Sequence, residues 1–162
     1  MAREEIEDYC KDNDLQPKID QSNFDNSYTR NKIRNQLIPY LKEEYNPNII
    51  EAMARMASII REEDEYIEEE VQKAYKEIAL EQSPKEIILD LKKFNLLKKV
   101  IKNRMVLYSV RQLFGSSAGI EKKHIEDIIL LCKRNIGNKF LIPNKKVKIL
   151  VKNQKIFFIK NQ

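Results

Sequence analysis

Apolar residues recur every three or four positions through residues 48–81, and this period predicts one long amphipathic helix. The stripe lapses near Asp64, which leaves open whether the helix bends there. Heptads are not sustained, so the pattern favours the central helix of a bundle over a coiled-coil partner helix. The acidic run between Glu62 and Glu70 is interpreted as a solvated face.

Shorter helical patterns precede this segment. Residues 3–13 predict one helix, and a second helix is expected to begin after a polar, turn-rich run. Asn26 or Ser27 is the expected N-cap of that second helix. Pro39 is expected to end or kink it, because proline lacks an N–H and restricts the residue before it.

Three further helices are predicted after the long one. Ser83-Pro84 is typical of a helix start, with Ile87, Ile88 and Leu91 as the packing face. The helical pattern resumes over 95–114, where Gly115 is the expected C-cap, and again over 120–134.

Near the C-terminus the period changes from helical to alternating. Residues 139–142, 146–151 and 156–159 predict three short strands, with Val147, Ile149 and Val151 on one face of the middle strand. The expected fold is therefore mainly α, a helical bundle with a small C-terminal antiparallel β-ribbon. In class it is α+β, and the ribbon is expected to pack on the last helix.

Two arginines one turn apart are the first candidate functional residues. Arg30 and Arg34 would share one face of the second helix and form a cationic platform, on which each guanidinium can grip a phosphate or carboxylate. The alternative is a structural clamp, in which they pair with Asp20 or Asp25. Residue chemistry alone leaves both interpretations open.

Charge is distributed unevenly along the chain. Residues 1–82 hold 11 Lys/Arg and 20 Asp/Glu, whereas residues 83–162 hold 19 Lys/Arg and 5 Asp/Glu. A basic half of this kind indicates a polyanion partner, or alternatively a lysine-rich solvated surface. Lys146, Lys148 and Lys152 of the middle strand are candidates to follow a phosphate backbone, although edge lysines also prevent strand aggregation.

Other chemistry is sparse. Cys10 and Cys132 have no metal-ligand spacing, and His124 is the only histidine, so no metal site is expected. The two cysteines are interpreted as buried or inert thiols of a cytoplasmic protein. No apolar run is long enough to span a membrane, and a membrane partner is not expected.

Several motifs together resemble the tRNA(Ile)-lysidine synthetase family. They are Arg3-x-Glu5-Ile6-x-x-Tyr9-Cys10, Asp20-x-Ser22-Asn23, Thr29-Arg30-Asn31-x-Ile33-Arg34, Leu37-Ile38-Pro39-x-Leu41, Asn46-Pro47 and Gly137-x-Lys139-x-Leu141-x-Pro143-Asn144. The resemblance covers most of the chain and is most specific in the first 47 residues. It implies three parts: 1–46 as the end of a catalytic domain, 47–136 as a helical tRNA-contacting domain, and 137–162 as a β-meander packed on that domain.

The resemblance also implies a function. The family uses ATP and magnesium to adenylate the wobble cytidine of tRNA(Ile) with a CAU anticodon, and L-lysine then displaces AMP to form lysidine. Arg30, Asn31 and Arg34 are expected to contact the tRNA, together with Lys146, Lys148 and Lys152. Asp20 and Asn23 are expected to order the loop that presents the arginines, and Asn31 is a further candidate for that role. A homodimer is possible.

The sequence departs from the family in one respect. The family holds ATP with a Ser-Gly-Gly-x-Asp-Ser loop, whereas this chain has only Gly115, Gly119 and Gly137, none adjacent. We therefore expect an excised or truncated piece of a longer ligase that binds no ATP and is inactive by itself. The alternatives are a free-standing helical RNA- or protein-binding adaptor, and a structural interaction module built on the helix over 48–81.

Overall fold

The computed structural model describes residues 3–15, 18, 20–116, 119–134 and 139–161. By its internal contacts the chain divides into two units, Met1–Ser58 and Ile59–Gln162, which are described separately below. Gly137, part of the predicted C-terminal motif, lies outside the described residues.

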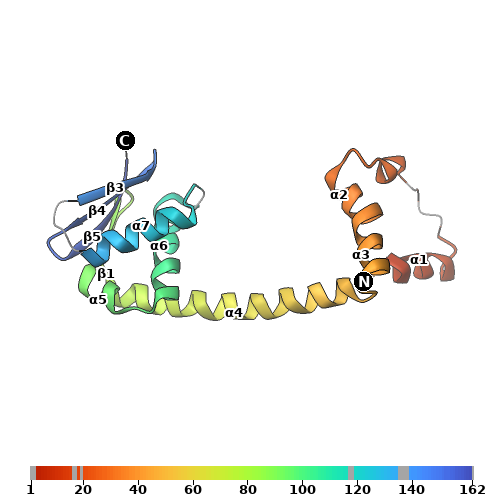
Figure 1. Ribbon diagram of the computed structural model, residues 1–162, viewed down its shortest axis with the longest axis horizontal. Coiled ribbons are helices and arrows are strands. Elements are labelled where there is room, and N and C mark those ends of the chain that lie inside the picture. The colour runs from red at the N-terminus through yellow and green to blue at the C-terminus, as the bar shows by residue number, and fades with distance from the viewer. Residues whose placement is uncertain (1–2, 16–17, 19, 117–118, 135–138, 162) are drawn as a thin grey trace. The chain divides into compact units, whose positions relative to one another are not determined.

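The first unit consists of short helical segments and the beginning of a long helix (Figure 1). Its elements are α1 (Arg3–Asp12), the 3-10 turn η1 (Gln21–Phe24), α2 (Thr29–Lys32), the π-helical turn η2 (Ile33–Leu37), α3 (Ile38–Glu44) and the first part of α4 (Ile49–Ile78). The segments α2, η2 and α3 follow one another without a break.

Pro39 does not end the second helix, contrary to one of the two expectations for it. Helical structure continues to Glu44, and the irregularity is the π turn that comes just before the proline. In that turn the Ile38 N–H donates to the Ile33 carbonyl, one residue farther back than in an α-helix. The expected N-cap was also wrong, since Tyr28 occupies that position and makes no side-chain capping bond.

The long helix α4 is a single element of 30 residues, and it ends at Ile78, three residues before the predicted end. Its buried residues, Val71, Tyr75 and Ile78, all lie in its last third. Met53 and Met56, which belong to the same predicted stripe, are more than half exposed. The expectation of a central bundle helix therefore holds only for the C-terminal third of α4.

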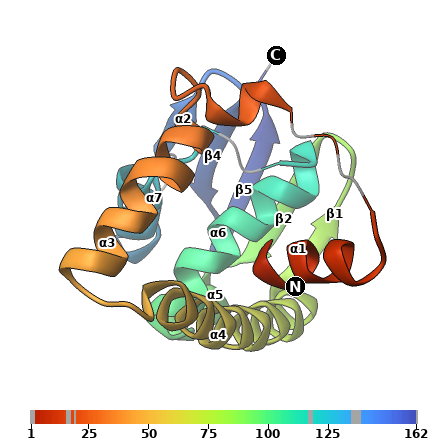
Figure 2. The same cartoon turned by 90° about the vertical axis from the view of Figure 1, so that its right-hand side faces the viewer.

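The second unit is a five-stranded antiparallel sheet with helices packed against it. The strand order is β1-β2-β5-β4-β3. The bounds of the elements are β1 (Ala79–Gln82), β2 (Glu86–Asp90), α5 (Leu91–Leu96), α6 (Lys99–Phe114), α7 (Lys122–Arg134), β3 (Lys139–Asn144), β4 (Val147–Lys152) and β5 (Lys155–Lys160). Figures 1 and 2 show α6 and α7 beside the strands of the sheet.

The class prediction, mainly α within α+β, is confirmed, as are the three C-terminal strands to within two residues at each end. The sheet is larger than the predicted ribbon, because residues 79–82 and 86–90 are strands and not helix. Ser83 begins a tight turn between them: its N–H donates to the Glu86 carbonyl at 2.8 Å, and its hydroxyl accepts from the Glu86 N–H at 3.1 Å.

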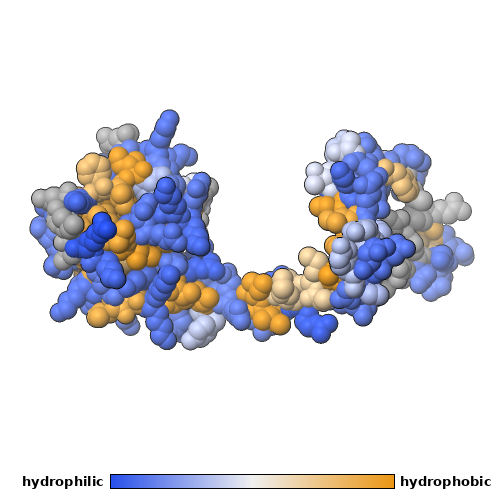
Figure 3. All heavy atoms as spheres, viewed as in Figure 1, coloured by the Kyte–Doolittle hydropathy of each residue, from blue (hydrophilic) through white to orange (hydrophobic). Residues whose placement is uncertain are grey.

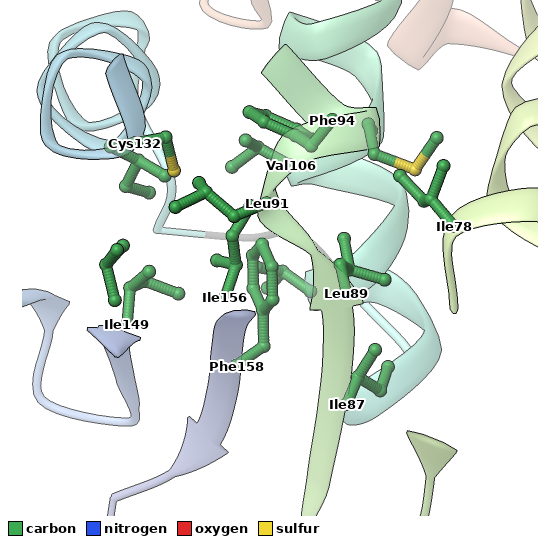
Figure 4. Packing of buried hydrophobic residues seen from close by; sticks show 14 of the residues in the cluster. Ile78, Ile87, Leu89, Leu91, Phe94, Val106, Cys132, Ile149, Ile156 and Phe158 are labelled. Atoms are coloured by element: carbon green, nitrogen blue, oxygen red, sulfur yellow. The ribbon is translucent and has the colours of Figure 1, made fainter. Parts of the chain in front are cut away.

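The core of the second unit lies between the helices and one face of the sheet. Ile149 of β4 is opposite Phe158 of β5, which is in turn opposite Ile87 of β2, so these three side chains share the inner face. Figure 4 shows how they meet residues from α5, α6 and α7, among them Phe94, Val106 and Cys132. Burial of this apolar surface stabilises the unit.

Several local expectations in the second unit are met. Gly115 is the C-cap of α6 with a φ of 75°, a left-handed conformation that glycine adopts without strain. Asn153 and Gln154 form the turn between β4 and β5, both with positive φ. In the part of the chain that the structure describes, no helix combines the length and apolar character needed to cross a membrane.

Candidate nucleic-acid interface

The loop before α2 is ordered by its own carboxylates. Asp20 Oδ1 accepts a hydrogen bond from the Ser22 N–H at 2.9 Å, and Asp25 Oδ1 accepts one from the Ser27 N–H at 2.9 Å. These bonds stabilise the charged forms, so they lower the pKa of Asp20 and of Asp25 below the usual aspartate value. Asp20 thus has the loop-ordering contacts expected of it.

Two asparagines one turn apart tie the loop to the helix. Asn31 is buried, and its Nδ2 donates to the carbonyls of Ser22 at 2.7 Å and Asp25 at 2.9 Å. Asn35 Nδ2 donates to the Asn23 carbonyl at 3.0 Å and to Asn26 Oδ1 at 3.1 Å. Asn23 takes part in the loop through its backbone, because its N–H also donates to the Asp20 carbonyl.

These contacts assign a supporting position to Asn31, which was expected both to order the loop and to contact RNA. Both hydrogens of its Nδ2 are used within the loop, so a contact with RNA through that amide would break the loop's own bonds. Sequence reasoning missed Asn35. Its signal was the spacing of four from Asn31, which places both amides on one side of the helix.

Arg30 in α2 and Arg34 in the following π turn η2 are both exposed. Among the side chains that the structure describes, neither arginine is within ion-pair distance of a carboxylate, so the clamp to Asp20 or Asp25 is not formed. Arg30 is the smallest of the influences that lower the pKa of Asp20, behind the bonds from Ser22. The Arg30 guanidinium lies 5.7 Å from the centre of the Tyr28 ring, a cation–π distance.

An apolar groove runs along the neighbouring side of this helix. Ile33, Leu37 and Tyr40 line it together with Thr29, Lys32 and Gln36. The three large side chains are each between two fifths and three fifths exposed. The helix therefore presents both a cationic and an apolar surface.

The second candidate set lies in the other unit, on β4. The inner residues Val147, Ile149 and Val151 are fully buried, as the alternation predicted. Lys148 and Lys152 have the opposite parity and lie on the outer face of the sheet. Lys146, just before the strand, has the same parity and is exposed. The structure thus places Lys148 and Lys152 on one face of the sheet and Lys146 in the turn that leads into the same strand.

Other cations of the basic half are neutralised within the protein. Arg104 of α6 pairs with Asp64 of α4, and Arg111 pairs with Glu68 one turn farther along. The acidic run of α4 was expected to be a solvated face. Part of it instead forms ion pairs with α6. Because these two arginines are already paired with carboxylates, they attract a polyanion less than the lysines of β4 do.

The two cysteines differ in environment. Cys132 is fully buried in the core, and burial raises the pKa of its thiol to about 12, so at neutral pH it is a protonated, unreactive group. Cys10 is half-buried in α1. Within the described ranges, no cluster of His, Cys, Asp or Glu side chains is arranged to hold a metal ion.

Comparison with known proteins identifies relatives for nearly the whole chain. Residues 1–41 match a family model described as a PP-loop domain. The tRNA(Ile)-lysidine synthase of Clostridioides difficile is 35% identical over 96% of this chain and 35% of its own length. The enzyme of Caldanaerobacter subterraneus subsp. tengcongensis is 36% identical over 88% of the chain and 30% of its own length.

A more distant relative agrees. The tRNA(Ile)-lysidine synthase of Geobacillus kaustophilus is 27% identical over 93% of this chain and 32% of its own length. The chain spans about a third of the length of these curated relatives. The resemblance to this family, expected from the motifs to cover most of the chain, is thereby confirmed, and this chain is homologous to about a third of the length of tRNA(Ile)-lysidine synthases.

Proposed function

We propose that this chain contributes tRNA binding and positioning to a tRNA(Ile)-lysidine synthase. Identities of 35% and 36% to such enzymes, over about nine tenths of the chain, support the assignment. The observation that carries the binding role is the exposed pair Arg30 and Arg34, which form no ion pair with a described carboxylate, on a helix whose loop is fixed by four amide hydrogen bonds.

Each arginine suits a phosphate. A guanidinium presents parallel N–H donors that match two oxygens of a phosphate, and it stays charged at any physiological pH. Asn31 and Asn35 tie the preceding loop to the turn that carries the arginines, so the arginines project from a fixed support. A fixed support lowers the entropy lost when the contact forms.

The proposal also divides the chain into parts with different roles. We propose residues 1–46 as the end of the catalytic domain, which the PP-loop match over 1–41 supports. Residues 47–136 and 137–162 then form the tRNA-contacting part, in which β3, β4 and β5 join the sheet against the helices. In this proposal tRNA(Ile), ATP, magnesium and L-lysine are the ligands of the whole enzyme, which acts in the cytoplasm.

The chain's own residues do not fit ATP. The region that matches the PP-loop domain contains no glycine at all, so its backbone cannot make the close approach that a phosphate loop requires. Gly115 caps α6, and a Cβ on Gly119 would lie 3.2 Å from Asn144 Nδ2. Neither glycine is placed between a strand and a helix. No step through ATP is therefore assigned to this chain.

The binding role predicts a salt dependence. An unmodified tRNA(Ile) with a CAU anticodon should bind the 162-residue chain, and its affinity should fall by about tenfold or more between 50 and 200 mM salt if two or three phosphates are contacted. Fluorescence anisotropy of labelled tRNA measures this slope. An affinity that does not change with salt would count against a phosphate-binding role.

A further inference from the structure

The outer face of β3, β4 and β5 carries a row of apolar side chains. Phe140 of β3 is directly opposite Leu150 of β4, Leu150 is opposite Phe157 of β5, and Phe157 is opposite Ile88 of β2. Ile88 does not belong to the core cluster that the inner face forms with the helices, but it is itself buried, so the accessible part of this row lies on β3, β4 and β5. Figure 3 shows apolar surface on this unit, interrupted by polar side chains.

Lysines frame this row. The Lys148 ammonium lies 4.6 Å from the centre of the Phe140 ring, a close cation–π contact. At the other end of β4, Lys152 is directly opposite Lys155 of β5. Lys155 is also directly opposite Asp90 of β2, which offsets part of the repulsion between the two lysines, and an anion bound beside Lys152 would reduce it further.

The charge on the outer face is polarised across the sheet. Residues 139–162 contain seven lysines and no Asp or Glu. The outer residues of β2, in contrast, include Glu86 and Asp90, and Glu81 of β1 is opposite Ile88. A polyanion is therefore attracted most to β3 and β4 and repelled from β1 and β2, whose Glu86 and Asp90 lie directly beside β5.

We propose that this part of the outer face binds unpaired RNA nucleotides, with bases stacked on Phe140 and Phe157 and phosphates held by Lys148, Lys152 and Lys155. Aromatic rings on a sheet stack on base faces, whereas neighbouring cations follow the backbone. Phe140 is 53% exposed, and Phe157 is half-buried. A duplex offers its phosphates but hides its base faces in the stack. The platform thus selects loop or single-stranded nucleotides. It rests on the proposed function, since that identifies RNA as the partner.

The test compares two RNA probes on the full 162-residue chain. One is an oligouridylate of about 12 nucleotides, within the site sizes of such surfaces, and the other is a duplex of the same length. Phe140→Leu and Phe157→Leu keep an apolar side chain but remove the ring. Each should weaken binding of oligouridylate by about fivefold or more and leave the duplex unchanged. Lys148→Glu should weaken both probes.

Two matched controls lie elsewhere on the chain. Tyr66→Leu removes an exposed ring from α4, and Lys123→Glu reverses an exposed lysine on α7; neither should change oligouridylate binding. The proposal is overturned if both phenylalanine variants bind oligouridylate as the wild type does. It is equally overturned if the chain forms a dimer by sedimentation and Phe140→Leu dissociates it, because the face is then a protein interface.

The outcomes separate this inference from the proposed function. If tRNA binding depends on salt but the phenylalanine variants match the wild type, only the stacking platform fails. If the wild-type chain binds neither tRNA nor oligouridylate at 50 mM salt, the proposed function fails and this inference with it.

Discussion

Neighbouring residues of one helical turn take different tasks in the first unit. Asn31 is buried, and its side-chain amide donates two hydrogen bonds to carbonyls of the preceding loop. Arg30, one position earlier, is exposed. A neutral amide satisfies buried carbonyls at little desolvation cost, and a guanidinium does not. The support of the site and its charge therefore come from different side chains.

Asn31→Ala tests this division. The substitution removes two hydrogen bonds and leaves the Ser22 and Asp25 carbonyls without them, so we expect a loss of about 1–3 kcal/mol in the local stability of the loop. Amide hydrogen exchange at Ser22 and Asn23 measures it. Gln36→Ala, an exposed change on the same helix, is the control. Unaltered exchange in Asn31→Ala would remove Asn31 from its supporting position.

The loop-ordering expectation for Asp20 came from the family resemblance, and residue chemistry missed the contacts of Asn35. The capping role of Asp20 agrees with the expectation that it orders the loop, since a short carboxylate readily accepts nearby backbone N–H groups. The alternative that Asp20 or Asp25 clamps an arginine did not hold among the described side chains, where each of these carboxylates accepts a nearby backbone N–H. Opposite charge near in sequence does not by itself predict an ion pair.

At the scale of elements, β2 is a strand where the sequence pattern predicted a helix. Ser83-Pro84 has the form of a helix start, and three apolar residues in a row fit a buried helix or a buried strand. This segment is a strand because it pairs with β5, which lies about 70 positions away in the sequence. The local pattern contains no information about a partner so distant. The alternating strands β4 and β5, joined by a short turn, could be predicted because their pairing is local.

The long helix α4 shows a second limit. Its apolar stripe is nearly continuous in sequence, but only its last third is buried. Periodicity identifies the face that a helix would bury and does not say what covers it. The exposed part of the stripe includes Met53, Met56 and Ile60.

This difference along α4 predicts two unequal substitutions. Ile78→Ala deletes a fully buried side chain and should lower the free energy of unfolding of the 162-residue chain by about 2–5 kcal/mol. Met56→Ala, at a side chain more than half exposed, should change it by about 0.5 kcal/mol or less. Urea denaturation followed by circular dichroism measures both. Equal effects would mean that a partner surface covers Met56 in solution.

At the scale of the whole molecule, the charge asymmetry of the sequence is only partly available to a partner. Arg104 and Arg111 pair with the acidic run of α4, whereas the lysines of β4 lie on the outer face of the sheet. The excess of lysine and arginine in residues 83–162 is read directly from the sequence. The sequence could not say which of the cations are neutralised internally, since those pairs join positions about 40 residues apart.

The distribution of glycine along the whole chain leads to a prediction about ATP. With no glycine in residues 1–41 and no phosphate cradle built from the described glycines, the 162-residue chain should show no binding of ATP with magnesium. Isothermal titration calorimetry tests this directly. Dissociation constants in the micromolar range would contradict it and would require a nucleotide site of a different kind.

The central claim is that Arg30 and Arg34 hold tRNA, and one comparison of binding tests it most directly. We expect Arg30→Ala and Arg34→Lys each to weaken binding of unmodified tRNA(Ile) to the chain by about tenfold, the cost of one charge-assisted contact. Lysine keeps the charge of Arg34 but loses the two-pronged geometry. Arg55→Ala, an exposed arginine of α4, is the matched control and should bind as the wild type does.

Melting curves of the same proteins complete the measurement. The variants should melt as the wild type does, because neither arginine is paired with a described carboxylate and no stabilising contact of that kind is lost. Wild-type affinity in both Arg30→Ala and Arg34→Lys would contradict the account. A lowered melting temperature with unchanged affinity would contradict it as well and would return the two arginines to a structural role.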